Sequence, residues 1–356
     1  MAAPRIIPIF LPYQGCRQRC IYCNERIATG VAPGALSEET LQKIMALSSG
    51  RSKPDRRPVQ IAFYGGTFTG MAAEEQTRLL RMVQPFLREG RVDSLRISTR
   101  PDEIDEDNLD LLRRHGVKTV EIGAQSLVED VLRRSRRGHT VEDVLSAVKR
   151  LRRKGFEIGI HLMAGLPGDS RQSFATTIDR TCILQPDTVR LHPTLVFKDT
   201  ALETLYNEER YSPLSLSEAV RQSRYALLRL EKAGIAVIRI GLQTTPEMEI
   251  PGNVVAGPFS PALRSLVNAG IFREMASLQL SAVAPEGRTV AFLLSQRDIS
   301  DFRGKKNENI AFLTKRFGLQ GIRIAGSPDY PRGWLTLRSD GRTVVLHRTG
   351  LLTTLS

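Results

Sequence analysis

Three cysteines near the N-terminus constrain this chain more than any other feature. Cys16, Cys20 and Cys23 stand at C-x3-C-x2-C spacing within eight residues, directly after an apolar run at 6–11. Iron and sulfide prefer soft thiolate ligands, and short cysteine spacings are typical of chains that hold iron–sulfur clusters. Three thiolates on a cluster of four irons leave one iron open to a small chelating molecule. The spacing therefore predicts a [4Fe–4S] site on these cysteines.

Two other uses of the cysteines fit less well. A structural zinc site usually takes four protein ligands, yet the chain has one further cysteine, Cys182, and no second C-x2-C or H-x3-H pair. A disulfide would leave an odd thiol and needs an oxidising compartment. Cys182 falls within a predicted helix, and we interpret it as a small core residue.

Composition limits the class of partner. The chain has 356 residues and a formal net charge of +13. A surplus of this size favours a polyanion such as nucleic acid, although a basic surface also serves solubility. No apolar run approaches the ~18 residues of a membrane span, and residues 1–12 lack the pattern of a signal peptide. We therefore expect a cytoplasmic protein without a membrane partner.

Short apolar runs alternate with amphipathic stretches, which predicts parallel βαβ units. The predicted strands are 6–11, 60–64, 94–98, 119–122, 157–163 and 188–192, and the predicted helices are 38–48, 73–89, 106–115, 141–154 and 170–184. Six such units predict an α/β fold, a partial (β/α)6 TIM-like barrel. A Rossmann-like sheet is the alternative, and the lack of G-x-G-x-x-G in the first turn counts against it.

Unusual residues follow each predicted strand. In barrels of this kind the chemistry lies at the carboxyl ends of the strands. The first strand is followed by the cysteines, and the others by 65–69, 98–102, 123–126, 164–168 and 192–194. These segments predict one site at a shared rim. His161 and His192 lie within the alternating pattern of two predicted strands, and we interpret them as packed or rim residues rather than metal ligands.

The cysteine spacing, with Tyr22 between the second and third cysteines, resembles the signature of the radical S-adenosylmethionine (SAM) superfamily. Residues 8–273 also resemble the radical SAM module of the Elongator catalytic subunit and its bacterial relatives. The matching segments are 63–70, 99–102, 120–126, 137–140, 165–168, 189–194 and 237–243. The resemblance implies SAM on the open iron, its reductive cleavage to a 5′-deoxyadenosyl radical, and an electron donor such as flavodoxin or ferredoxin.

The resemblance also implies cofactor-binding residues. Gly65, Gly66 and Thr67 match the superfamily segment that binds the methionyl amino group of SAM. Glycines permit close backbone approach, although a Gly-Gly pair also serves simple turns. Tyr22, between two cluster cysteines, is assigned to the same cofactor site.

Four further side chains complete the expected SAM site. Arg100 stands where the superfamily places groups near the ribose and carboxylate, with pairing to Asp102 as the alternative. Gln125 and Ser126 carry an amide and a hydroxyl that can bond sugar hydroxyls. Met163 is expected to cover the adenine or to pack in the core. No residue is assigned a catalytic role.

Two departures from the Elongator pattern limit what the resemblance implies. Elongator enzymes have a wider gap between the first two cysteines, and they carry an acetyltransferase domain whose acetyl-CoA loop we do not find. Ser98 also stands where those enzymes tend to have an acid. We therefore do not assign the complete wobble-uridine carboxymethylation reaction of the Elongator family to this chain. We expect a branch of the family without the acetyltransferase domain.

The composition changes towards the C-terminus. We divide the chain into a barrel with its extension, 1–280, and a basic α+β domain, 281–356, which has twelve Lys or Arg against six Asp or Glu. This domain resembles a KH-type RNA-binding core, whose G-x-x-G loop clamps nucleotide backbones. Here Asn307 replaces the second glycine, and Asn tolerates a left-handed backbone. Lys305 and Lys306 would face phosphates; the alternative is a basic helical lid.

Three functions compete. The first is a radical SAM enzyme that modifies RNA, most simply tRNA. The second is a radical SAM enzyme that acts on a small molecule such as a tetrapyrrole, as in the similar oxygen-independent coproporphyrinogen oxidases. The third is a non-catalytic RNA-binding protein that keeps the cluster as a sensor. Salt-dependent tRNA binding and SAM cleavage discriminate between them.

Overall fold

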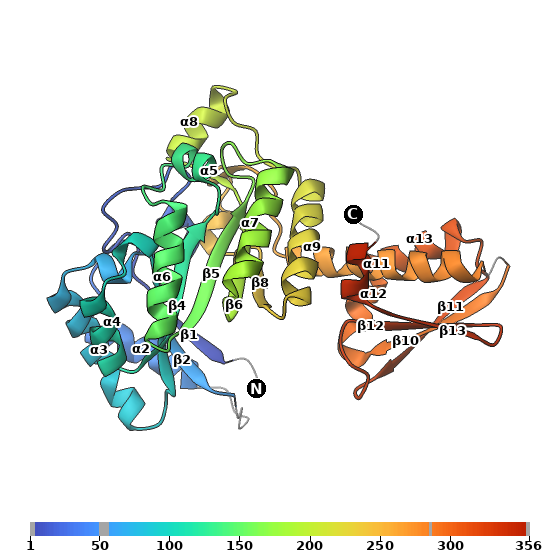
Figure 1. The fold of residues 1–356 in the computed structure, drawn as a ribbon, viewed down its shortest axis with the longest axis horizontal. Helices are drawn as coiled ribbons and strands as arrows, with labels where there is room; N and C mark the ends of the chain where they lie inside the picture. Colours follow the sequence, from blue (N-terminus) through green and yellow to red (C-terminus); the bar gives the residue numbers. More distant parts are fainter. Residues whose placement is uncertain (1–3, 50–56, 285–286, 354–356) are drawn as a thin grey trace. The chain divides into compact units, whose positions relative to one another are not determined.

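The chain forms two compact units. The computed structural model describes residues 4–49, 57–284 and 287–353 (Figure 1). The first unit comprises Met1–Leu214 and Leu242–Phe259, and the second comprises Ser215–Gly241 and Ser260–Ser356. Among the residues that the structure describes, no helix combines the length and the apolar character that crossing a membrane requires.

A parallel sheet forms the centre of the first unit. Six of its seven strands are β1 (Arg5–Phe10), β2 (Val59–Tyr64), β3 (Ser94–Thr99), β4 (Val117–Gln125), β5 (Glu157–Ala164) and β6 (Thr188–Pro193). They lie side by side in chain order, and every neighbouring pair is parallel. The six predicted strands and the partial TIM-like barrel are confirmed.

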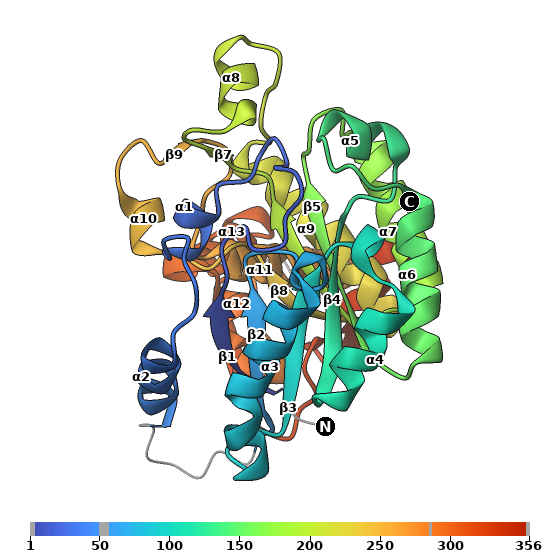
Figure 2. The ribbon, with the colours of Figure 1, turned by 90° about the vertical axis from the view of Figure 1, so that its left-hand side faces the viewer.

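Helices connect these strands and cover one face of the sheet (Figure 2). They are α2 (Glu38–Ser49), α3 (Ala73–Arg88), α4 (Glu106–Arg114), α6 (Val141–Arg153) and α7 (Arg171–Leu184), as predicted. Local chemistry starts them where the sequence indicates: Asp105 accepts a hydrogen bond from the backbone N–H of Asn108, and Thr140 forms a capping box with Asp143. Such caps satisfy backbone donors that the first turn leaves unpaired.

Short elements complete the first unit. They are α1 (Glu25–Thr29), α5 (Glu129–Arg134), α8 (Ala201–Asn207), α10 (Pro246–Glu249) and an antiparallel pair, β7 (Val196–Phe197) with β9 (Val254–Ala256). Apolar side chains alternate along the main strands, and Ile61, Leu95 and Val120 are fully buried. Within each strand, the polar residues that alternate with the apolar ones therefore point to the other face of the sheet.

The second unit is built around a four-stranded sheet in the order β11-β10-β12-β13. Its elements are α9 (Leu216–Lys232), β8 (Ala236–Ile240), α11 (Leu263–Val283), β10 (Thr289–Ser295), α12 (Ile299–Arg303), α13 (Glu308–Arg316), β11 (Gly321–Ser327), β12 (Trp334–Ser339) and β13 (Arg342–His347). Strands β10 and β11 are parallel, whereas β12 is antiparallel to both β10 and β13. The C-terminal α+β arrangement is confirmed.

The turn between α12 and α13 has the backbone that the sequence predicts. Gly304 has φ +69°, Lys306 has φ +51° and Asn307 has φ +62°. Asn307 thus occupies the left-handed region that glycine usually fills, which asparagine tolerates better than other side chains. The phosphate contacts expected of Lys305 and Lys306 remain a prediction.

Candidate cluster and cofactor site

The three predicted cluster cysteines lie in one loop between β1 and α1. Cys16, Cys20 and Cys23 are all partly buried, and none forms a disulfide. In the part of the chain that the structure describes, no three His, Cys, Asp or Glu side chains come close enough to hold a single metal ion. A cluster takes one thiolate per iron and spreads its ligands more widely.

The loop after β2 holds the cysteine loop through its backbone. The N–H of Thr67 donates to the carbonyl of Gln14 at 2.8 Å, and the N–H of Tyr13 donates to that of Gly65 at 2.8 Å. A Cβ atom on Gly66 would lie 2.4 Å from the Gln14 carbonyl oxygen, and one on Gly15 would lie 2.1 Å from that of Thr67. These glycines are thus required for the two loops to approach.

Thr67 also touches a cluster cysteine directly. Its Oγ1 lies 3.2 Å from Cys16 Sγ, so a residue predicted to bind SAM also orients a thiol. The packing role of Gly66 was not anticipated from the sequence, where the glycines were assigned to SAM. The contact of Gly65, Gly66 and Thr67 with SAM stays a prediction.

Arg137 brings a positive charge to the cysteine loop. This buried side chain donates from Nη1 to Cys20 Sγ at 2.7 Å and from Nη2 to the Gly123 carbonyl at 2.6 Å. Burial opposes its charge, yet Tyr22 and Cys20 hold the pKa of Arg137 above its usual range. A charged donor stabilises a thiolate, the form that binds metal.

Sequence reasoning did not assign this role to Arg137. Its segment, 137–140, was singled out as one that resembles the Elongator module, and in the structure Thr140 caps α6. The neighbouring His139 is buried and lies 3.3 Å from the Ala124 carbonyl oxygen. Burial lowers the pKa of His139 to about 3. His139 is therefore a packed residue.

Three of the predicted SAM residues, Arg100, Gln125 and Tyr22, carry buried polar side-chain atoms without partners among the described residues. Arg100 pairs with Asp102 through two hydrogen bonds of 3.0 and 2.6 Å, as the alternative interpretation expected. Its Nη1 nevertheless lacks a partner among the described residues, as does Oε1 of Gln125. Both follow parallel strands, at the ends where barrel sites form. Buried polar atoms normally find partners, so these two fit a polar cofactor such as SAM.

Ser126 has polar partners in the protein, whereas Tyr22 and Met163 make apolar contacts. Ser126 Oγ lies 3.2 Å from Thr177 Oγ1 and accepts from the backbone N–H of Val128. Tyr22 is buried in an apolar cluster, and the partly buried Met163 packs against that cluster. Core packing, the alternative for Met163, is thus what the structure shows for it. A contact of these side chains with SAM stays a prediction.

A charged network lies on the polar face of the sheet and was missed by sequence reasoning. The Glu121 carboxylate accepts from Arg96 and from Arg190, the latter at 3.0 Å, and Tyr64 donates to it at 3.3 Å. Arg96 and Glu121 are almost completely buried. Two guanidinium groups face one carboxylate, so the network has an excess positive charge. The signal was present: charged residues alternate with apolar ones in buried strands.

The two strand histidines meet each other. His161 Nε2 lies 2.9 Å from His192 Nδ1, and their rings are arranged edge to face. Burial, helped by the nearby Arg190, lowers the pKa of His161 to about 4. The two rings pack against each other, and the interpretation that they are not metal ligands stays a prediction.

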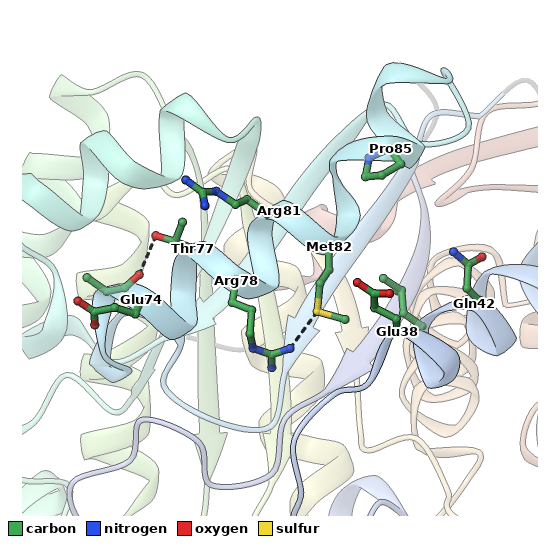
Figure 3. A pocket seen from close by; sticks show the side chains of 10 residues that line it. Glu38, Gln42, Glu74, Thr77, Arg78, Arg81, Met82 and Pro85 are labelled. Atoms are coloured by element: carbon green, nitrogen blue, oxygen red, sulfur yellow. Dashed lines mark hydrogen bonds between the residues drawn. The ribbon is translucent and has the colours of Figure 1, made fainter.

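A separate hollow of about 730 Å³ lies between α2 and α3 (Figure 3). Arg78 lies in it and donates to Met82 Sδ at 3.1 Å. Glu38, Gln42 and Glu74 add polar groups. None of its lining residues belongs to the cysteine loop or to the predicted SAM site.

Comparison with known proteins agrees with this geometry. The model of the Radical SAM superfamily matches residues 10–181, and the model of the Radical_SAM C-terminal domain matches residues 186–273. Together they cover about three-quarters of the chain.

Individual relatives are more distant. A tRNA uridine(34) acetyltransferase of Methanocaldococcus infernus is 28% identical over 47% of this chain and 35% of that protein. The oxygen-independent coproporphyrinogen-III oxidase-like protein HemZ of Bacillus subtilis is 26% identical over 76% of this chain and 55% of that protein. The chain thus spans about a third to a half of the length of these relatives.

A solved structure has the same fold. The archaeal Methanocaldococcus infernus Elp3 with an N-terminal deletion superposes with a TM-score of 0.57, at 21% identity, over 76% of this chain and 63% of that one. Both family models lie over the barrel and the segment that follows it, and the first contains all three cluster cysteines. The chain belongs to the Radical SAM superfamily, whose enzymes use a [4Fe–4S] cluster and S-adenosylmethionine.

Proposed function

We propose that this protein is a radical SAM enzyme that modifies tRNA. One observation carries the enzymatic part. Three thiols lie in one loop beside the guanidinium of Arg137, and Arg100 and Gln125, at the ends of neighbouring strands, carry unpaired buried polar atoms. The similarity to a tRNA uridine(34) acetyltransferase and the net charge of +13 support tRNA as the substrate. A polyanion is the natural partner of such a charge.

The chain's own residues have distinct tasks in this proposal. Cys16, Cys20 and Cys23 hold the cluster, and Arg137 stabilises the Cys20 thiolate. When bound, the cluster supplies the electron that cleaves SAM, and it receives that electron from a donor such as flavodoxin or ferredoxin. The protein binds SAM, orients it and excludes water.

The residues assigned to SAM fall into two groups. Arg100 and Gln125 offer a buried donor and a buried acceptor. The others shape the site around the cofactor. They are Tyr22, Gly65, Gly66, Thr67, Ser126 and Met163.

The decisive experiment is anaerobic. The protein is reconstituted with iron and sulfide, reduced with dithionite and supplied with SAM, and 5′-deoxyadenosine is measured with and without bulk tRNA. We expect SAM cleavage that tRNA stimulates, and its loss in Cys20→Ser. The matched control is Cys182→Ser, because this remaining cysteine lies in α7, outside the cysteine loop. Absence of iron in the reconstituted wild type would refute the proposal.

A tetrapyrrole substrate is the second candidate. The similarity to HemZ, which covers 76% of this chain, favours it. The same assay separates the two, because a tetrapyrrole enzyme would cleave SAM without a response to tRNA and would bind a porphyrinogen. A cluster without any SAM cleavage would instead favour the non-catalytic RNA-binding protein.

A further inference from the structure

The sheet of the second unit has one face packed against helices. Phe292, Leu335 and Leu337 are fully buried on this face. The ring of Phe302, from α12, lies 4.9 Å from that of Phe292, and Gln279 of α11 donates to the Leu335 carbonyl at 2.8 Å. The apolar core of the unit therefore lies between this face and α11 and α12.

The opposite face, which we call the outer sheet face, is a mixture of basic, aromatic and small residues. Strand pairing sets its rows: Arg323, Ala291, Arg338 and Thr343 form one row across the four strands, and Ala325, Leu293, Thr336 and Val345 form the next. Trp334 and His347 pair in a third row. Val345 is 52% exposed and Trp334 is 38% exposed, which is unusual for large apolar side chains.

Arg323 and Arg338 lie at one end of the outer sheet face, and Arg342, which pairs with Ser339 in the row of the other face, borders the same end of the sheet. A hollow of about 420 Å³ is lined by Arg323, Arg338 and Arg342, together with Asp340. Asp340 is already paired with Arg288. Across the described residues, none of the three lining arginines forms an ion pair. The hollow therefore carries about three uncompensated positive charges, and an anion would complement them.

An aromatic platform lies on the same face. The rings of Trp334 and His347 are 4.9 Å apart and inclined by 47°. Trp334 and Arg338 are both on β12 and four residues apart, which places them on one face roughly 13 Å apart at the rise of a strand. Arginines and an exposed aromatic ring thus lie on the same face of β12, separated by Thr336, which is 4% exposed and hydrogen-bonded to the Tyr330 hydroxyl.

We propose that the outer sheet face binds a single-stranded segment of the RNA substrate. The arginines of the hollow contact phosphates, and a base stacks on Trp334. Arginine forks match phosphate geometry, and aromatic side chains on sheet surfaces are a common platform for unpaired bases. The charge complementarity favours a polyanion over a neutral protein surface. This inference rests on the proposed function, because it assumes that the substrate is RNA.

The outer sheet face is distinct from the KH-like turn. Lys305 and Lys306 lie between α12 and α13, and Phe302 of α12 packs on the inner side of the sheet. The turn therefore belongs to the helical side of the unit. The two surfaces make different predictions for mutagenesis.

Trp334 provides a direct readout because it is the single tryptophan of the chain. The full-length protein is titrated with a short oligouridylate, and both tryptophan fluorescence and the anisotropy of labelled RNA are followed. We expect quenching and a logarithmic salt slope of about −2 for three phosphate contacts. Arg338→Ala combined with Arg342→Ala reduces the slope to about −0.7. Trp334→Ala weakens binding by about five- to hundredfold, and Trp334→Phe restores part of the loss.

The matched control is Lys149→Ala combined with Lys315→Ala, which removes the same charge from exposed positions on α6 and α13 that have no assigned role. We expect its affinity to stay within about twofold of wild type. Far-UV circular dichroism verifies that each variant is folded. Two outcomes overturn the proposal: the arginine double variant binds like wild type, or the lysine double variant is the one that loses binding. Heparin binding without quenching of Trp334, and no quenching by RNA, would also overturn it, because only charge would then be recognised.

The SAM-cleavage assay separates this inference from the proposed function. If tRNA stimulates SAM cleavage in the arginine double variant as in wild type, the proposal that the outer sheet face binds the RNA substrate is wrong, and the proposal that tRNA is the substrate stands. If the outer sheet face binds RNA as expected but tRNA does not affect cleavage, the proposed function fails on its own.

Discussion

The Glu121→Gln substitution tests the charged network in the first unit. In the native protein one carboxylate is shared by two guanidinium groups, those of Arg96 and Arg190. The substitution keeps the size of the side chain and removes its charge. Both arginines then remain beside each other without a counter-ion, and Arg96 is only 3% exposed.

The expected cost follows from burial and distance. The Glu121–Arg190 contact is 3.0 Å, and at an effective dielectric constant of about 20 two unit charges at this distance attract each other by about 5.5 kcal/mol before desolvation. Removing one partner of a buried ion pair usually costs about 3–5 kcal/mol, since the other charge stays buried. Because two guanidinium groups are left here, we expect a loss of about 5 kcal/mol in the free energy of unfolding.

Urea unfolding of the apoprotein, followed by far-UV circular dichroism at neutral pH, measures this loss. The midpoint is expected to fall while the slope with denaturant is unchanged. The matched control is Glu106→Gln, whose carboxylate pairs with Arg153 and Lys154 at the surface and is 45% exposed. The control should leave the midpoint close to wild type. A loss below about 1 kcal/mol for Glu121→Gln would refute the reasoning.

Three further predictions concern the site and its surroundings. Arg137→Gln removes the charged donor to Cys20 and should weaken iron retention by about tenfold or more. The iron content after competition with a chelator measures this effect, and an unchanged iron content would argue against this role of Arg137. Gly66→Ala forces a Cβ to 2.4 Å from a backbone carbonyl and should lower both the thermal midpoint and iron loading, whereas Gly34→Ala, with open space around it, should change neither. The pKa of His161 is lowered from 6.5 to about 4 in the folded protein. As the pH falls, His161 therefore takes up a proton in the unfolded chain before it does so in the folded protein. The stability present above pH 6.5 consequently declines as the pH falls towards 4. His161→Gln should flatten that decline in midpoints measured across this pH range, and an equally steep decline would contradict the assignment.

Local patterns in the sequence were sufficient for much of the fold and for the grouping of three thiols in one loop. The C-x3-C-x2-C spacing places three thiols in one short loop whatever surrounds it, because a few residues limit how far they can separate. The alternation of apolar runs and amphipathic stretches fixed the order of strands and helices, since burial periodicity is a property of the local chain. The left-handed backbone of Asn307 was likewise readable from its position and its type.

Partners that meet across long stretches of chain were decided only by the tertiary structure. Arg137 reaches Cys20 from 117 residues away, and Glu121 meets Arg190 across two neighbouring strand pairs. The outer sheet face exists because strand register aligns Arg323 with Arg338 through Ala291. Hydrophobic periodicity predicts which side of a strand is buried. Packing and strand register determine which charged residues face one another there, and both are properties of the folded chain as a whole.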